Sequence, residues 1–230
     1  MTKPIIGIVG KHMKLEKYPR PERPFALMYD EVRQAVIDHG AVPIGILSPS
    51  RGIQRHADRT QDYLSEEELV LLNAQLTLCD GLFFQGGTYI TDFEYTLARI
   101  AYERDIPTLG VCCGQTVIAE AFGAEITNVD PGAHQRDDDR YAHNSSVVSE
   151  TKFAEIVQVP EMMVNSRHYR AVVSCPVLRA GALDQDGHIE VLEAPEKKFY
   201  FATRFHPESL YTEDPVIDRI FQEFIAAASR

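Results

Sequence analysis

Residues 107–121, PTLGVCCGQTVIAEA, join a short apolar run to a helical pattern through two cysteines between two glycines. The run PTLGV is typical of a buried strand, and QTVIAEA is typical of a helix that follows it. The pattern Gly-x-nucleophile-x-Gly at such a junction indicates a sharp strand-to-helix turn. Only Cys112 lies centrally between Gly110 and Gly114. We therefore predict Cys112 as a nucleophile on this turn.

The cysteine pair also allows other interpretations. Both thiols could be small core residues, since free cysteines are often buried, and a vicinal disulfide or a metal site are further alternatives. The four cysteines, at 79, 112, 113 and 175, show no C-x-x-C spacing, and no Cys/His pair is spaced for zinc. A helix N-terminus favours the thiolate, and the N–H of Cys113 can stabilise an oxyanion. These points favour Cys112 as the working thiol.

The order of strand-like and helix-like segments predicts the fold. In the first two thirds, buried apolar runs alternate with helical patterns, which indicates βαβ units and a mostly parallel sheet. Expected strands cover 4–10, 41–47, 80–87 and 107–114, and expected helices cover 25–39, 65–76, 92–104 and 115–124. The last third holds the β-like runs HNSSVVS, FAEIVQV, MMVNS, HIEVLEA and FYFATRF, and then a helix at 214–229 that Pro215 can start.

These patterns predict an α/β fold with a mostly parallel sheet flanked by helices and a β-hairpin-rich second half, in one domain over residues 1–230. The formal net charge of −11 argues against a phosphate-binding nucleic-acid protein. The N-terminus lacks the features of a signal peptide, and no apolar run approaches the roughly 18 residues that span a bilayer. We expect a cytoplasmic protein with reduced thiols and neither a nucleic-acid nor a membrane partner.

A nucleophilic thiol needs a base and a group that orients the base. The segment ATRFHPES ends a β-like run, and in an extended chain His206 and Glu208 point to the same side. Glu208 can therefore hold the imidazole of His206 while its other nitrogen faces a thiol. A surface histidine is the plainer alternative. The strand FFQGGTY ends in Gly86 and Gly87, whose N–H groups can turn toward a ligand or simply form a turn.

The segment HQRDDDRYAH (134–143) places two histidines around three aspartates. Such a group can suggest a metal site, but charge runs usually form solvated loops. We therefore predict a solvated loop here and no metal site in the chain.

In chain order, GG, G-x-C-x-G and H-P-E resemble the class I glutamine amidotransferase superfamily. The chain as a whole resembles its γ-glutamyl hydrolase branch, the peptidase family that includes the γ-glutamyl-γ-aminobutyrate hydrolases. DGLFFQGG is similar to that branch's D-G-L-x-x-P-G-G, and IPTLGVCCGQ to its I-P-x-L-G-I-C-R-G. VNSRHYRAV, DGHIEVLE and RFHPE resemble V-N-S-x-H-x-Q-A-V, D-G-x-I-E-A-I-E and Q-W-H-P-E.

The resemblance implies a flavodoxin-like fold and a Cys-His-Glu triad that hydrolyses a γ-glutamyl amide C–N bond through a thioester. Cys112 would be the nucleophile, His206 the base and Glu208 the orienting carboxylate, with the N–H groups of Gly87 and Cys113 as the oxyanion hole. It implies no cofactor and a small γ-glutamyl substrate. Because related enzymes are often dimers, a homodimer is also compatible with the resemblance. The substrate-binding positions that it suggests are Gly86, Gln115, Thr116, Asn165, Ser166, His168 and Arg170.

Several of these positions depart from the family pattern. Cys113 replaces the usual Arg, Thr116 stands where Gln is common and Gln115 lies one residue early. Arg170 replaces another Gln, and Tyr89 an Asp. The acyl chemistry is therefore predicted more firmly than the acyl donor. A glutaminase subunit that delivers ammonia to a separate synthase, and a non-catalytic binding protein, remain alternative functions.

Overall fold

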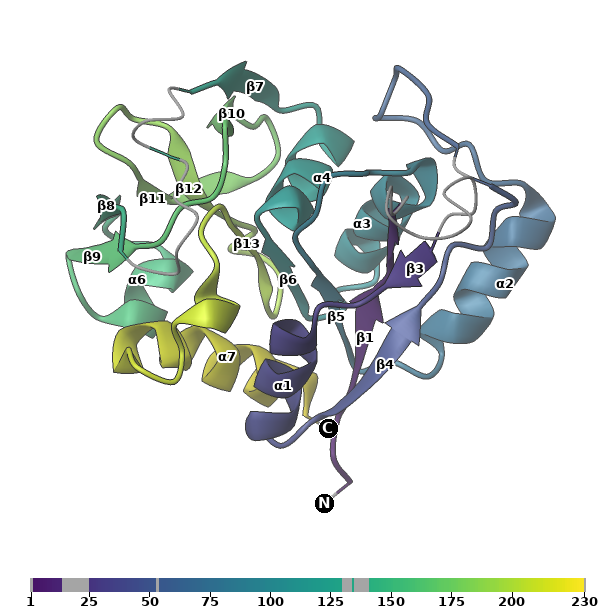
Figure 1. Cartoon of the computed structure of the whole chain (residues 1–230), viewed down its shortest axis with the longest axis horizontal. Helices are drawn as coiled ribbons and strands as arrows, with labels where there is room; N and C mark the ends of the chain where they lie inside the picture. The colour runs from purple at the N-terminus through teal and green to yellow at the C-terminus, as the bar shows by residue number, and fades with distance from the viewer. Residues whose placement is uncertain (1, 14–24, 53, 130–133, 135–140, 230) are drawn as a thin grey trace, which may run out of the picture.

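The structure is a computed structural model that describes residues 2–13, 25–52, 54–129, 134 and 141–229. Its main feature is an 11-stranded sheet whose first half is parallel, in the order β4-β1-β5-β6-β13 (Figure 1). These strands are β1 (Ile5–Val9), β4 (Val42–Ile46), β5 (Gly81–Phe84), β6 (Thr108–Val111) and β13 (Tyr200–Thr203). β1, β5, β6 and β13 are buried almost throughout, as strands covered on both faces must be.

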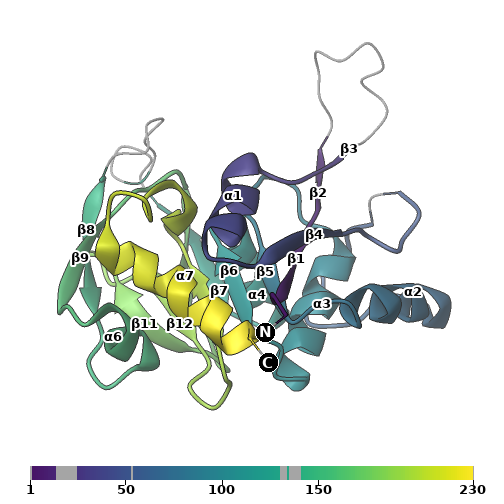
Figure 2. The same cartoon turned by 90° about the horizontal axis from the view of Figure 1, so that it is seen from below.

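Helices cover both faces of this parallel half. One face packs against α1 (Asp30–Asp38) and α7 (Pro215–Ala228), which lie next to each other in Figure 2. The other face packs against α2 (Glu66–Leu76), α3 (Asp92–Glu103) and α4 (Cys113–Ala121). Local sequence starts these helices: Ser65 forms a capping box with Glu68, and Asp214 accepts from two N–H groups beside Pro215.

The second half of the sheet is antiparallel. β12 (Ile189–Glu193) pairs with β13 and continues the sheet through β11 (Arg179–Leu183), β8 (His143–Val147) and β9 (Glu161–Val164). β10 (Arg170–Ser174) pairs with β12 and with β7 (Glu125–Asn128), and the short strands β2 (Lys11–Met13) and β3 (Phe25–Leu27) form a separate sheet. A short 3-10 helix, η1 (Pro207–Ser209), follows β13.

This architecture confirms the predicted α/β fold with a parallel sheet flanked by helices and a β-rich second half. Two expected elements are wrong. FAEIVQV contains the helix α6 (Lys152–Val157), because Thr151 caps its N-terminus and Phe153 and Val157 bury one helical face. The helix expected over 25–39 begins only at Asp30. Over the described residues, no helix is long and apolar enough to cross a membrane.

Candidate active site

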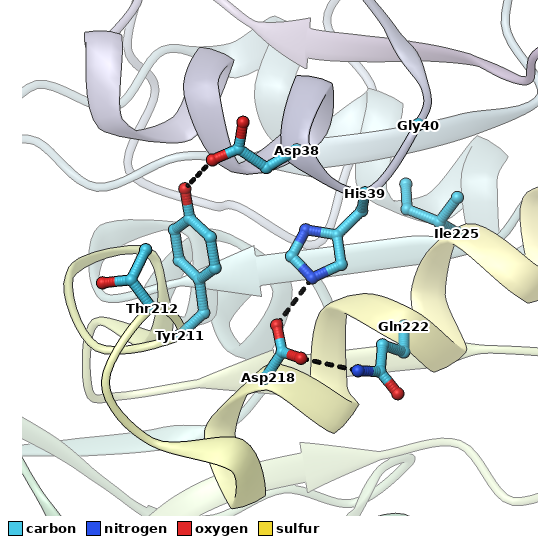
Figure 3. A pocket seen from close by; sticks show the side chains of 8 residues that line it. All are labelled: Asp38, His39, Gly40, Tyr211, Thr212, Asp218, Gln222 and Ile225. Atoms are coloured by element: carbon cyan, nitrogen blue, oxygen red, sulfur yellow. Dashed lines mark hydrogen bonds and ion pairs between the residues drawn. The ribbon is translucent and has the colours of Figure 1, made fainter.

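A cavity of about 820 Å³ lies between α1 and α7, away from the cysteine turn (Figure 3). Its polar side chains satisfy one another. Tyr211 donates to Asp38 (2.7 Å), while Asp218 pairs with His39 (2.8 Å) and accepts from Gln222 (2.5 Å). These groups are thus paired with one another rather than left for a ligand.

Two smaller cavities, of about 130 and 210 Å³, meet at Cys112. Cys112 joins β6 to α4 with φ 53° and ψ −106°, a strained conformation for a residue with a side chain. Glycine at positions 110 and 114 allows this turn to pack closely against neighbouring atoms. A Cβ on Gly114 would overlap the carbonyl oxygen of Phe84, and one on Gly110 would lie 2.7 Å from Ile118 Cδ1. The turn therefore needs glycine on both sides of the thiol.

His206 and Glu208 lie at the same place as Cys112. Nδ1 of His206 is 2.7 Å from Oε1 of Glu208. A Cβ on Gly86 would contact both His206 Cε1 (3.2 Å) and Cys112 Cβ (3.7 Å), so the ring and the thiol share one space. Asn165 fixes the backbone of His206 from both sides, since it accepts from His206 N–H (2.8 Å) and donates to His206 C=O (3.1 Å).

The charges of this pair favour a thiolate and an imidazolium. Burial alone would raise the pKa of the Cys112 thiol, but His206 and Arg204 outweigh burial and lower that pKa to about 7. Burial alone would lower the pKa of His206, but Glu208 and Cys112 outweigh burial and raise it to about 10. Between these values the buried pair carries opposite charges, which is the form that attacks a carbonyl carbon.

Gly87 and Cys113, whose N–H groups are the expected oxyanion hole, both border the smaller cavity at Cys112. Gly87 has φ 136°, a conformation that favours glycine, and it lines both cavities. Cys113 is the first residue of α4, and the first N–H groups of a helix have no partner within it. The Cys113 thiol turns inward, 3.6 Å from Nζ of Lys11, and burial raises its pKa. Its side chain is thus separate from the thiol of Cys112.

The smaller cavity has a cationic wall. Arg55, Arg167, Arg170 and Arg204 line it, together with Thr116 and His168. Arg170 pairs with Glu120 (2.9 Å). Arg204 donates instead to neutral oxygens, namely the Cys112 and Arg170 carbonyls and the Thr116 hydroxyl. Its charge is therefore available to an anionic group of a ligand.

The 210 Å³ cavity adjoins the first one and has a more mixed lining. Besides Gly86, Gly87 and Thr88, it is lined by Tyr29, Glu31, Arg167, His206 and Glu208. Two carboxylates and a phenol thus border this cavity, together with Arg167, which lines both cavities.

Three of the expected substrate-binding residues form hydrogen bonds with the backbone around the site. Gln115 is buried and donates to the carbonyls of Ile189 (3.1 Å) and Glu190 (3.2 Å). Ser166 donates to the carbonyl of His134, and Asn165 holds His206. Gly86, Thr116, His168 and Arg170 do line a cavity at Cys112. Gln115, Asn165 and Ser166 thus hold neighbouring backbone groups in place, whereas the four cavity-lining residues can contact a ligand.

Sequence reasoning missed Arg204, Lys11 and Gln85. Arg204 stands two residues before His206 in RFHPE, a spacing that places both on one side of an extended chain. Lys11 is buried in an ion pair with Glu94 beneath Gly87. Burial lowers the pKa of Lys11, but Cys113 and Glu94 outweigh that effect and raise it. Gln85 binds Val9, Leu27 and Tyr29 through their backbones, which explains a glutamine where proline is usual.

The ends of the segment 134–143 are not solvated. His134 and His143 are both buried, contrary to the exposed loop that we predicted, while residues 135–140 lie outside the described residues. The physical reason is local pairing: His168 N–H donates to the carbonyl of His134 (2.9 Å), and His143 belongs to β8.

The chain is similar to known proteins over the part that holds these residues. The Peptidase C26 family model matches residues 91–208, just over half of the chain, and this span contains Cys112, His206 and Glu208. The glutaminase domain of Trypanosoma brucei CTP synthase, solved with bound acivicin, superposes with a TM-score of 0.67 and 18% identity, covering 98% of this chain and 94% of that chain. This likeness shows that the fold is shared.

Two curated relatives differ in how much of their length is matched. CTP synthase of Levilactobacillus brevis is 27% identical over 186 residues, which cover 66% of this chain and 35% of that protein. A glutamine amidotransferase-like protein of Rickettsia prowazekii is 24% identical, with 98% of both chains covered. The chain thus spans about a third of the length of the CTP synthases that it matches.

Proposed function

This chain belongs to the Peptidase C26 family, with a class I glutamine amidotransferase-like fold, and on that basis we propose that it hydrolyses γ-glutamyl amides of small amines. One observation carries the proposal: Cys112 lies on its strained turn between two unlike cavities, beside the His206–Glu208 pair.

The proposed reaction starts at the Cys112 thiolate. The sulfur attacks the γ-amide carbonyl carbon, and the N–H groups of Gly87 and Cys113 stabilise the resulting oxyanion. The imidazolium of His206 gives its proton to the leaving amine, and the C–N bond breaks to leave a γ-glutamyl thioester. Neutral His206 then takes a proton from water, which attacks the thioester and releases glutamate. The thiolate and the imidazolium are thereby restored.

We assign the two ends of the substrate to the two cavities. The arginine-lined cavity would bind the α-carboxylate of the glutamyl group, because Arg204 has no carboxylate among its described partners. The larger cavity would hold the leaving amine beside Glu31 and Tyr29. Glu208 is paired with His206, so Glu31 is the carboxylate that would favour an amine with a positive charge over one that carries a carboxylate. A glutaminase needs no such space, because ammonia is its leaving group.

The test is a substrate panel of L-glutamine, γ-glutamyl conjugates of neutral and cationic amines, and a γ-glutamyl conjugate with an anionic leaving group. We expect kcat/KM for cationic conjugates to exceed that for glutamine by about 10-fold or more. Glu31→Gln should reduce this preference and leave glutamine turnover unchanged, and Cys112→Ala should abolish both. Activity that persists in Cys112→Ala, or no glutamate release from any conjugate, contradicts the proposal.

A second candidate function is a glutaminase that delivers ammonia to a separate synthase, and the similarity to CTP synthases favours it. Glutamine turnover with no turnover of any amine conjugate would support this function over the first. Stimulation of glutamine hydrolysis by a co-purifying protein would then identify the synthase.

A further inference from the structure

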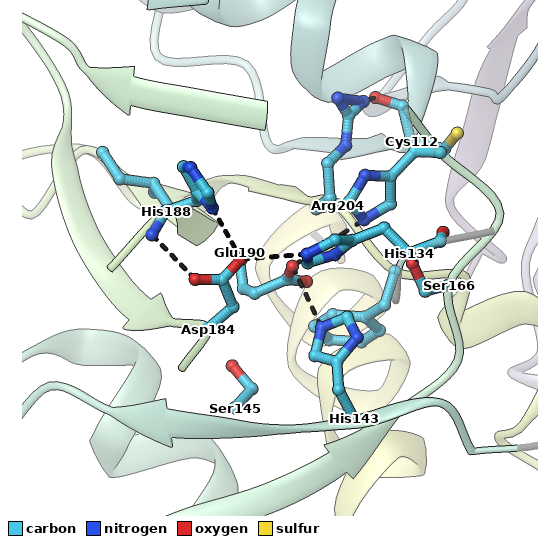
Figure 4. A network of polar contacts seen from close by, with 12 residues as sticks. Cys112, His134, His143, Ser145, Ser166, Asp184, His188, Glu190 and Arg204 are labelled. Atoms are coloured by element: carbon cyan, nitrogen blue, oxygen red, sulfur yellow. Dashed lines mark hydrogen bonds and ion pairs between the residues drawn. The ribbon is translucent and has the colours of Figure 1, made fainter. Parts of the chain in front are cut away.

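Two histidines and a glutamate that the proposed hydrolysis does not use form a buried cluster near the nucleophile turn (Figure 4). His143 comes from β8 and Glu190 from β12, while His134 is held by hydrogen bonds from the segment at Ser166 and His168. One ligand atom of each of His134, His143 and Glu190 lies within 4.8 Å of the other two. All three side chains are more than nine-tenths buried.

Several polar atoms here have no hydrogen-bond partner among the described residues. They are Oε2 of Glu190, Nδ1 of His134 and both ring nitrogens of the neighbouring His168. A buried polar atom without a partner costs about 1–3 kcal/mol, so such atoms rarely gather at one place without a ligand. A ligand bound at this place would satisfy several of these atoms at once.

The donor set and the spacing fit a metal ion. Nε2 of His143 is 3.3 Å from Oε1 of Glu190, and Nε2 of His168 is 3.8 Å from that same oxygen. Two ligands about 2.0–2.2 Å from a tetrahedral ion lie about 3.3–3.6 Å apart, which the His143–Glu190 distance matches. Two imidazoles and one carboxylate form a donor set that zinc uses, with a fourth position left open.

We propose that His134, His143 and Glu190 bind a divalent first-row transition metal, Zn²⁺ in the first instance, with His168 next to the fourth position. Our sequence reasoning predicted no metal, because it placed the histidines of 134–143 in solvent. In the structure both histidines are buried beside Glu190, where they can serve as ligands.

A neighbouring group of possible ligands, His134 with Asp184, Asp186 and His188, fits less well. Asp184 is already occupied, because it accepts from the N–H groups of Asp186 and His188 and pairs with the ring of His188. It closes the turn between β11 and β12, and Asp186 is exposed. We therefore assign the ion to the buried group.

The ion would join the antiparallel half to the nucleophile turn. The backbone carbonyl of Glu190 accepts from Arg204 N–H (2.7 Å) and from the side chain of Gln115. Arg204 in turn donates to the carbonyl of Cys112. A metal bound to Glu190 would thus stabilise β12, and with it the contacts from Glu190 through Arg204 to Cys112. This inference does not depend on the proposed γ-glutamyl chemistry.

The experiment uses the full chain in a Cys112→Ala background, which removes the thiolate as a competing ligand. After treatment with a chelator, the protein is titrated with Co²⁺ and then with Zn²⁺. We expect about one equivalent of Co²⁺ to bind with the visible absorption of nitrogen and oxygen ligation, to be displaced by Zn²⁺, and to raise Tm.

Variants assign the site. Glu190→Gln and His143→Gln should each weaken Co²⁺ binding by more than about 10-fold, whereas His188→Gln, the matched control, should leave it unchanged. The melting curve of each metal-free variant shows whether it folds. Substoichiometric binding in the parent chain would overturn the proposal without any variant. Loss of binding in His188→Gln with retention in Glu190→Gln would place the ion on the turn and also overturn it.

Discussion

The parallel and antiparallel halves of the sheet assemble polar groups in different ways. In the parallel half, Cys112 follows β6 and His206 follows β13, and these adjacent strands run in the same direction. Their carboxyl ends therefore deliver both groups to one edge, where α/β sheets bind ligands. In the antiparallel half, His143 and Glu190 lie within strands and point into a buried space. The first arrangement exposes the proposed nucleophile to two cavities, and the second buries the residues of the proposed metal site.

Removal of the base should have the largest effect on the parallel half. His206→Ala should lower kcat/KM for a γ-glutamyl amide by about 10³-fold or more, because it removes the proton donor and the charge that holds the thiolate. The matched control is His188→Gln, a histidine change in the antiparallel half, which should leave kcat/KM unchanged. Steady-state kinetics on both purified variants measures this difference. Equal losses in the two variants would show that the chemistry does not rest on the parallel half.

A second prediction compares glycine-to-alanine changes in the two halves. Gly114→Ala should lower the free energy of unfolding by about 3 kcal/mol, because the new Cβ would overlap the Phe84 carbonyl in a packed layer. Gly187→Ala lies at the β11–β12 turn with φ 85° and no atom within 4 Å of the new Cβ. It should cost only about 1–2 kcal/mol, from backbone strain. Urea unfolding of both variants tests this order, and a larger loss for Gly187→Ala would contradict it.

The parallel half is also the half that sequence patterns predicted well. Its strands are continuous apolar runs, and its helices carry their own signals, such as the capping box at Ser65 and the proline at 215. The antiparallel half contains shorter runs with weaker patterns. The helix α6 was mistaken for a strand, because FAEIVQV is rich in β-branched residues and the cap at Thr151 lies just outside it. Tertiary packing decided what the local pattern left ambiguous.

The residues of the candidate site also differ in how far the sequence alone could predict them. Cys112, His206 and Glu208 stand in contiguous motifs whose spacing carries the geometry, so they could be proposed from sequence. The roles of Arg204 and Gln115 depend on contacts with residues more than 70 positions away. Nothing local marks such contacts. The cluster of His134, His143 and Glu190 has the same cause, since Glu190 is far from the two histidines in sequence and reaches them through the antiparallel sheet, in which β11 lies between β12 and β8.

A third prediction concerns the pH dependence of the thiols. The pKa of Cys112 is lowered to about 7, whereas burial raises the pKa of Cys79 to about 11. Alkylation of Cys112 should therefore rise about 10-fold per pH unit below pH 7 and then level off. Alkylation of Cys79 should still be rising at pH 10. The proposed hydrolysis should increase through about pH 7 and fall through about pH 10, where His206 loses its proton.

Mass spectrometry of the alkylated peptides separates the thiols within one sample, so Cys79 serves as an internal control.

The two pKa shifts affect the pH dependence of stability in opposite directions. The lowered pKa of Cys112 contributes stability above its unfolded value that is lost as pH falls through about 7. The raised pKa of His206 contributes stability below its unfolded value that is lost as pH rises through about 10. A thiol at 112 that titrates like an ordinary cysteine would contradict the ion pair.

The smallest effect is expected at Arg204, where the two halves meet. Its guanidinium joins the carbonyl of Cys112 in the parallel half to that of Arg170 in β10, and its charge helps to lower the pKa of Cys112. Arg204→Met keeps a long apolar stem but removes the donors, so the midpoint of Cys112 alkylation should move above pH 7 while the thiol remains reactive. Arg204→Lys should restore the positive charge but not the paired contacts, because lysine lacks the planar fork. A midpoint that is unchanged in the Met variant would show that the halves are coupled through packing alone, and a midpoint restored by Lys would identify charge as the coupling.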